Sequence, residues 1–330
     1  AAMGLPRKLA GAALAAGAAA IALPRLLSKR SPDPPPPVPG VPKTYPWRHA
    51  DLFLAVRGRG PAALLLHDLY TGASGAEMQA LADLIVHRLE IHVADLPGFG
   101  RSGRPAMRYA PDLFFDAIVE LVRHAINRPT LVVGSGLTGA FAAEAALRLG
   151  DLATGLVLLG PPEPDRDGFI RPPLWGGAVY QLLRSPLGQA YHWWHASPVV
   201  QRRTLEVDLA TSTLDLEERA RRRSRSARQP GGAWPLWSLW TGDLVWDPRP
   251  ALARLGAPSL VLWGAETSGN PAAPEAYRAV RPDLDQVVVP GTARWPHVDD
   301  PVGAADTLLE WWERQASPAP TGRDPESGSE

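Results

Sequence analysis

The chain has 330 residues, of which 45% are hydrophobic, so it can bury the core of a large α/β domain and still carry an inserted segment. Lysine plus arginine and aspartate plus glutamate each total 34, and a formal charge of zero gives no global attraction to nucleic acid. The absence of cysteine excludes disulfides, thiolate metal sites and a cysteine nucleophile.

The N-terminal segment differs in composition from the rest of the chain. Two basic residues precede an alanine-rich apolar run at 9–24, and three more basic residues follow it. We predict a membrane anchor or an uncleaved signal-like helix at 1–30, with an amphipathic transit peptide as a third alternative. Basic residues flank both sides, so the side of the membrane is not predicted. The expected location is membrane-associated through this segment.

Two further segments have compositions that oppose regular structure. Prolines dominate 31–45, which predicts an extended polyproline II linker. Residues 317–330 are polar and rich in proline and glycine, so we expect a disordered tail.

The body of the chain alternates between apolar runs and helix-period segments. The predicted strands are Ala62 to Leu66, Ile91 to Ala94, Thr130 to Val133, Gly155 to Leu159, Ser259 to Trp263 and Gln286 to Val289. The predicted helices are Gly75 to Leu89, Pro111 to Ile126, Leu137 to Leu149, Pro271 to Val280 and Val302 to Gln315. This alternation predicts a parallel sheet covered by helices on both faces.

Residues 131–140 have the pattern of a strand, a sharp turn of small residues and the start of a helix. Such an elbow exposes one side chain at its tip and needs small residues two positions to either side. With Ser135 at the tip, the flanking positions would carry the bulky Val133 and Leu137. With Gly136 at the tip, both flanking residues are small, so the predicted tip has no nucleophilic side chain.

Several ordered segments carry a specific resemblance. They are the strand end LLLHD at 64–68, the loop DLPGFGRS at 95–102, GLVLLGPP at 155–162, LVLWG at 260–264 and the run from Val287 to His297. Together they resemble the α/β-hydrolase superfamily, in its capped form. The resemblance implies a mostly parallel central sheet with helices on both faces, a core at 46–161 and 251–316, and an inserted helical cap at 162–250.

The same resemblance implies positions for a serine, an acid and a histidine. In this sequence they fall on Gly136, Thr267 and Arg294. A guanidinium stays protonated at neutral pH, so Arg294 cannot replace the histidine as a base. Asp68 stands where glycine usually follows His67, and a carboxylate there would oppose an oxyanion if it pointed inward. The sequence therefore predicts a degenerate triad.

Neighbouring residues offer weak substitutes for the three side chains. Ser135, Glu266 and His297 would form a working set only if all three were displaced from their usual positions, and small positional errors are costly in catalysis. This set defines one alternative function, an active ester or related hydrolase.

The cap segment is rich in tryptophan and arginine. Its tryptophans are Trp175, Trp193, Trp194, Trp234, Trp237, Trp240 and Trp246. They predict either the cap's own core or an apolar surface that lines a ligand pocket or docks on a protein partner. The arginines at 219–228 predict a solvated face with local ion pairs, with phosphate or anionic lipid headgroups as the alternative. We expect no nucleic acid partner.

These observations favour a non-enzymatic, membrane-anchored binding or scaffold subunit. A second alternative, beside the hydrolase, is a receptor or carrier for a small hydrophobic anionic ligand. Its predicted pocket residues are His67, Asp68, Leu69, Leu137, Arg294 and Trp295. We expect neither a metal nor a cofactor.

Overall fold

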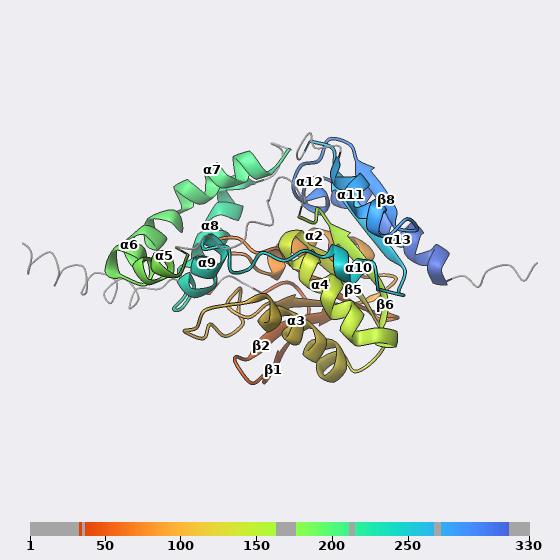
Figure 1. Ribbon diagram of the computed structural model, residues 1–330, viewed down its shortest axis with the longest axis horizontal. Helices are drawn as coiled ribbons and strands as arrows, with labels where there is room; N and C mark the ends of the chain where they lie inside the picture. The colour runs from red at the N-terminus through yellow and green to blue at the C-terminus, as the bar shows by residue number, and fades with distance from the viewer. Residues whose placement is uncertain (1–32, 35–36, 163–175, 211–214, 267–271, 317–330) are drawn as a thin grey trace, which may run out of the picture.

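The computed structural model describes residues 33–34, 37–162, 176–210, 215–266 and 272–316. Within them the chain forms an eight-stranded sheet with the order β1-β2-β4-β3-β5-β6-β7-β8 (Figure 1). The strands are β1 (Val41–Tyr45), β2 (Leu52–Arg57), β3 (Ala62–Leu66), β4 (Glu90–Asp95), β5 (Thr130–Ser135), β6 (Ala153–Leu159), β7 (Ser259–Gly264) and β8 (Asp285–Val289).

Strands β3 to β8 pair in parallel, whereas β1 and β2 are antiparallel to their neighbours. β3 and β5 are buried along their whole length, as expected for central parallel strands covered on both faces. The predicted mostly parallel sheet is confirmed. The carboxyl ends of β3 and β5 lie side by side, since Leu66 is in register with Gly134.

Helices cover both faces of this sheet. One apolar cluster joins the sheet to α3 (Pro111–Glu120), α4 (Gly136–Leu149), α10 (Arg249–Leu252) and α11 (Ala272–Val280). A second cluster joins the other face to α2 (Gln79–Ile85) and α13 (Pro301–Ala316). The shorter elements are η1 (Gly75–Met78), η2 (Leu121–Ile126), η3 (Gly150–Leu152) and α12 (Pro296–Asp299).

The cap consists of five described helices that lie together on one side of the core (Figure 1). They are α5 (Gly176–Leu183), α6 (Pro186–His195), α7 (Pro198–Asp208), α8 (Leu216–Ala227) and α9 (Ala233–Trp240). Ser185, Ser197 and Asp215 cap the N-termini of α6, α7 and α8, because each side chain accepts a hydrogen bond from the backbone three residues later.

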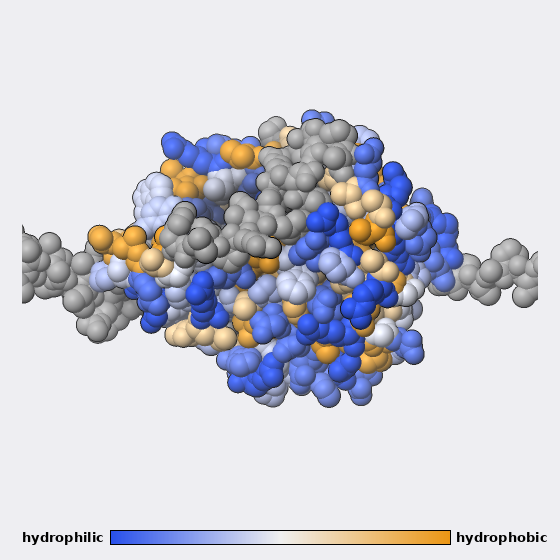
Figure 2. All heavy atoms as spheres, viewed as in Figure 1, coloured by the Kyte–Doolittle hydropathy of each residue, from blue (hydrophilic) through white to orange (hydrophobic). Residues whose placement is uncertain are grey.

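Three of the six described tryptophans of the cap serve packing, and Trp175 lies outside the described residues. Trp237 is completely buried and contacts Trp234 edge-to-face, and Trp246 packs against Phe115 of α3. Trp194 is 60% exposed. Figure 2 shows hydrophobic residues gathered on the surface at the end of the cap formed by α5 and α6. Trp240 lines a cavity described below. Packing therefore explains half of the described tryptophans.

Part of the predicted N-terminal linker forms a strand. Val41–Tyr45 was predicted within the linker but forms β1, because it pairs with β2 and Val38 is already buried in the core. The predicted anchor at 1–30 and the predicted tail at 317–330 lie outside the described residues.

Candidate functional site

Gly136 occupies the turn between β5 and α4 with a φ of +51°, a left-handed conformation that favours glycine. A Cβ added to Gly136 would lie only 2.0 Å from Cγ of Asp68. The carboxylate of Asp68 therefore occupies the space that a side chain at position 136 would take.

Two backbone amides hold this carboxylate from one side. Oδ1 of Asp68 accepts hydrogen bonds from the N–H of Leu69 at 2.7 Å and from the N–H of Leu137 at 2.8 Å. One amide follows β3 and the other follows the elbow tip, which is the arrangement of an oxyanion hole. In this structure the hole is occupied by the protein's own carboxylate.

Two side chains of the loop after β8 hold the other oxygen. Oδ2 of Asp68 accepts hydrogen bonds from Nε1 of Trp295 at 3.0 Å and from Nη2 of Arg294 at 3.2 Å. The Asp68 side chain is fully buried, whereas that of Arg294 is 43% exposed. The buried negative charge is thus compensated by two amides, an indole and a guanidinium.

His67 was predicted in the ligand pocket, but it is completely buried. Its Nε2 accepts a hydrogen bond from the Leu96 N–H at 3.1 Å, and its Nδ1 lies 2.7 Å from the Asp68 carbonyl oxygen. These contacts define a neutral ring that donates from Nδ1. His67 therefore fixes the β3 and β4 loops to one another and does not face a ligand.

Ser135 and His297 lie beneath the turn in a buried cluster with Glu77, a residue that the sequence analysis missed. His297 Nε2 is 3.2 Å from Glu77 Oε1, and both side chains are almost fully buried. The Ser135 hydroxyl is buried and lies close enough to Glu77 to help lower the pKa of that carboxyl. The Asp68 N–H also donates to Glu77.

The charge state of Glu77 follows from this cluster. Burial alone would raise the pKa of its carboxyl, but the hydrogen bond and charge of His297 outweigh burial and lower the pKa to about 2. Glu77 is therefore an anion that orders the segment below the turn. The sequence alone marked Glu77 only as an acidic residue in the first turn of the helix that follows the β3 loop.

The substitute set Ser135, Glu266 and His297 is not assembled. Glu266 is exposed, and its backbone N–H donates to the Thr292 carbonyl oxygen. His297 instead pairs with Glu77. Thr267, the expected acid position, lies outside the described residues.

Above the turn lies a cavity of about 270 Å³, which we call the cap pocket. It is lined by Leu69, Tyr70, Thr71, Leu137, His195, Gln201, Thr204, Asp208, Arg223, Leu239, Trp240, Arg294 and Trp295. Four of the six predicted pocket residues are among them, whereas His67 and Asp68 lie beneath its floor.

A hydroxyl and an imidazole meet at the wall of the cap pocket. Thr71 Oγ1 lies 3.1 Å from His195 Nδ1. Burial lowers the pKa of His195, so the ring is neutral near pH 7. In the tautomer that is protonated at Nε2, Nδ1 accepts a hydrogen bond from the Thr71 hydroxyl. Trp240 packs edge-on against His195 at a ring distance of 5.0 Å and fixes its orientation.

Asp208, at the end of α7, adds a perturbed carboxyl to the same pocket. Burial raises its pKa, although Arg294 and Arg223 act in the opposite direction. Titratable groups with shifted pKa values in a cavity are typical of functional sites. No group of three or more metal-ligating side chains occurs among the described residues.

Comparison with known proteins identifies the scaffold. The model of the alpha/beta hydrolase family matches residues 63–307. The chain belongs to this family. The solved 2-hydroxy-6-oxo-6-phenylhexa-2,4-dienoate hydrolase of Rhodococcus sp. strain RHA1 has the same fold, with a TM-score of 0.68 at 18% identity over 84% of this chain and all of that one.

Two curated relatives of this hydrolase-family chain are named as esterases. A pimeloyl-[acyl-carrier protein] methyl ester esterase of Chromobacterium violaceum is 26% identical over 81% of this chain and 100% of its own length. The protein of that name from Edwardsiella ictaluri is 28% identical over 79% of this chain and 96% of its own length.

These findings correct the predicted function. Both relatives match this chain over nearly their whole length and are named as esterases, so the predicted non-enzymatic scaffold is wrong and the chain is placed among hydrolases. The predicted membrane location is corrected as well, since these relatives are named as esterases. No helix in the described ranges is long and apolar enough to cross a bilayer.

Proposed function

We propose that this hydrolase cleaves carboxylic esters in the cap pocket, with Thr71 as the nucleophile and His195 as its base. The observation that carries the proposal is the 3.1 Å contact between Thr71 Oγ1 and His195 Nδ1 at the wall of that cavity. A hydroxyl within hydrogen-bond reach of a neutral imidazole is the basic unit of nucleophilic ester hydrolysis.

The elbow itself does not support the reaction in the usual way. Gly136 has no side chain, and Ser135 is completely buried below the pocket floor. On this assignment the serine position of the family carries no nucleophile, and the Asp68 carboxylate occupies the amides of the oxyanion hole. The proposal therefore places the reaction at Thr71 and His195, in the wall of the cap pocket and not at the elbow.

The steps balance with the groups present. His195 takes the Thr71 proton as Oγ1 attacks the ester carbonyl carbon, and the protonated ring then returns a proton to the leaving alcohol. Water, activated by the same ring, hydrolyses the acyl group from Oγ1. Arg294, which lines the pocket with its partly exposed side chain, is suited to stabilise the developing oxyanion.

The pocket lining and the relatives favour an ester of a small alcohol with an acyl chain. Leu69, Leu137, Leu239 and Trp240 supply apolar surface in the 270 Å³ cavity. The names of the relatives specify methyl ester hydrolysis of an acyl group. Both observations support a substrate whose acyl chain lies against this apolar surface.

Thr71→Val is expected to lower kcat for p-nitrophenyl butyrate by at least about a hundredfold, because the valine keeps the shape and removes the hydroxyl. His195→Phe should cause a similar loss. The measurement is steady-state hydrolysis, with a fluorophosphonate probe and mass spectrometry to locate the labelled residue.

Ser135→Ala is the matched control, since it removes a hydroxyl that the proposal does not use. Full activity of Thr71→Val would contradict the proposed centre. If Asp68→Asn lost activity and Thr71→Val kept it, the reaction would have to be assigned to Asp68 and Arg294 and not to Thr71.

The pH dependence should follow His195. Its pKa lies below the ordinary value of 6.5 because of burial, and the base must be unprotonated. We therefore expect kcat to rise with pH through a midpoint below 6.5 and to stay level through neutral pH. A midpoint above 7 would show that another group is the base.

A further inference from the structure

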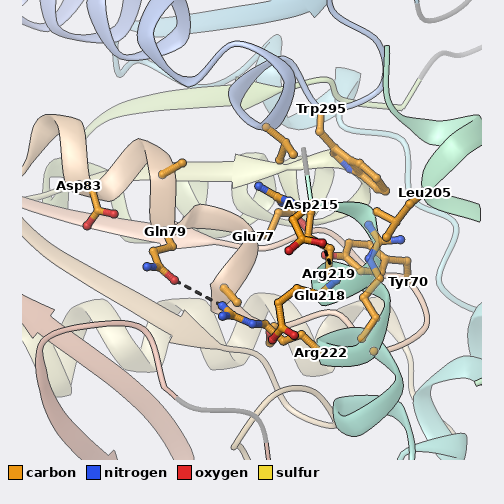
Figure 3. Close-up of a pocket in the computed structure, with 16 residues that line it drawn as sticks. Tyr70, Glu77, Gln79, Asp83, Leu205, Asp215, Glu218, Arg219, Arg222 and Trp295 are labelled. Carbon is orange, nitrogen blue, oxygen red and sulfur yellow. Dashed lines mark hydrogen bonds between the residues drawn. The ribbon is translucent and has the colours of Figure 1, made fainter. Parts of the chain in front are cut away.

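A second and larger cavity lies beside the cap pocket. Its volume is about 410 Å³, within the range of about 300–1,000 Å³ typical of small-molecule sites. Tyr70, Arg223 and Trp295 line both cavities and so form the wall between them. Figure 3 shows α8 on one side of this cavity and Gln79 and Asp83 on the other.

Three arginines of α8 line this cavity, which we call the arginine pocket: Arg219, Arg222 and Arg223. They are spaced so that one face of the helix presents all three. Arg222 Nη1 makes a long hydrogen bond of 3.4 Å to Gln79 Oε1 (Figure 3). Burial and the two neighbouring arginines lower the pKa of Arg219.

Three of the four carboxylates that line this cavity have other partners, and the fourth is Glu218. Asp83 pairs with Arg57, Glu77 pairs with His297, and Asp215 caps α8 by accepting the Glu218 N–H at 2.9 Å. No ion pair joins Arg219, Arg222 or Arg223 to a carboxylate within the described ranges. Three guanidinium groups thus share one cavity, and none of them is ion-paired with the four carboxylates that line it with them.

Arg223 is the decisive residue. It is only 9% exposed, and its guanidinium carbon lies 3.9 Å from the centre of the Tyr70 ring and 5.0 Å from that of Trp295. No hydrogen bond or ion pair joins it to a side chain in the described ranges, and the nearest carboxyl on which its charge acts in the cap pocket is that of Asp208. A cation that is more than nine-tenths buried normally has an anionic partner, and the aromatic faces compensate it only in part.

We propose that the arginine pocket binds an organic phosphate monoester. The phosphate group lies against Arg219, Arg222 and Arg223, and the organic part lies against Tyr70, Leu205, Trp295 and Val298. A phosphate monoester carries close to two negative charges at neutral pH and several acceptor oxygens, which suits a cluster of guanidinium donors better than a single carboxylate.

This site goes beyond ester hydrolysis, because it requires neither Thr71 nor His195. Its ligand contacts the wall that the two cavities share. The backbone supports the same wall: a Cβ at Gly72, whose φ is +78°, would lie 2.0 Å from the Arg223 carbonyl oxygen, so the β3 loop and α8 are in close contact.

The test is isothermal titration calorimetry of the full chain with phenyl phosphate, inorganic phosphate and benzoate. We expect saturable one-to-one binding of phenyl phosphate, weaker binding of inorganic phosphate and the weakest binding of benzoate. Arg223→Gln should weaken phenyl phosphate binding by about tenfold or more, as expected for loss of a charge-assisted hydrogen bond.

Arg221→Gln is the matched control, because Arg221 lies on the same helix but is 55% exposed and pairs with Glu217. It should bind phenyl phosphate like the wild type, and so should Thr71→Val. If Arg223→Gln does not fold, Arg219→Gln replaces it. The proposal is overturned if phenyl phosphate does not bind saturably, if benzoate binds as tightly, or if Arg221→Gln weakens binding equally.

Discussion

Gly136→Ala is expected to lower the free energy of unfolding by about 3 kcal/mol or more, through overpacking and a left-handed backbone. The added Cβ would lie 2.0 Å from Cγ of Asp68 and 2.2 Å from both carboxylate oxygens. Asp68 cannot yield without losing its bonds to the amides of Leu69 and Leu137. The measurement is urea denaturation followed by tryptophan fluorescence.

Two comparisons separate the clash from the backbone strain. Gly291 also has a positive φ, of +66°, but an added Cβ there meets nothing within 4 Å, so Gly291→Ala should cost only about 1–2 kcal/mol. In an Asp68→Gly background, the cost of Gly136→Ala should fall to the same level. An unchanged cost in that background would show that Asp68 does not fill the space beside position 136.

Glu77→Gln is expected to destabilise the fold by about 1–3 kcal/mol, the range for leaving a buried hydrogen-bonding group without its partner. The substitution keeps the shape of the side chain but removes the negative charge opposite His297. It also weakens the acceptor of the Asp68 N–H. Thermal and urea denaturation at neutral pH measure the loss.

Glu217→Gln is the control for a surface pair, because Glu217 and Arg221 are both about half exposed. It should change stability by no more than about 0.5 kcal/mol. A loss as small as this for Glu77→Gln would contradict a structural role for the buried pair.

The pH dependence of Glu77 gives a second measurement. Its folded-state pKa of about 2 lies below the ordinary 4.5, so its contribution to stability is present above pH 4.5 and is lost as the pH falls toward 2. The stability of the wild type should therefore fall more steeply than that of Glu77→Gln across this interval.

The sequence predicted the parallel sheet closely, since continuous apolar runs marked β3 to β8 to within one or two residues. It missed β1 and β2, because Val41–Tyr45 follows a run of prolines and is largely exposed. β1 becomes regular only by pairing with β2, the next strand along the chain.

The candidate site was less accessible to prediction. The spacing of small residues was enough to locate Gly136 at the turn, and the replacement of glycine by Asp68 was visible. The pairs Glu77–His297 and Thr71–His195 join positions 220 and 124 residues apart. No local pattern links residues at such separations, so only the folded chain brings these side chains together.

The occupied oxyanion hole also restricts the order in which this sequence can change. A serine at position 136 meets the Asp68 carboxylate, so this substitution is accepted only after residue 68 has become small. Two positions 68 residues apart in the chain are thus epistatic. The two substitutions that would restore a serine elbow can occur in either order. Only the order that changes Asp68 first gives a single-substitution variant that is well folded.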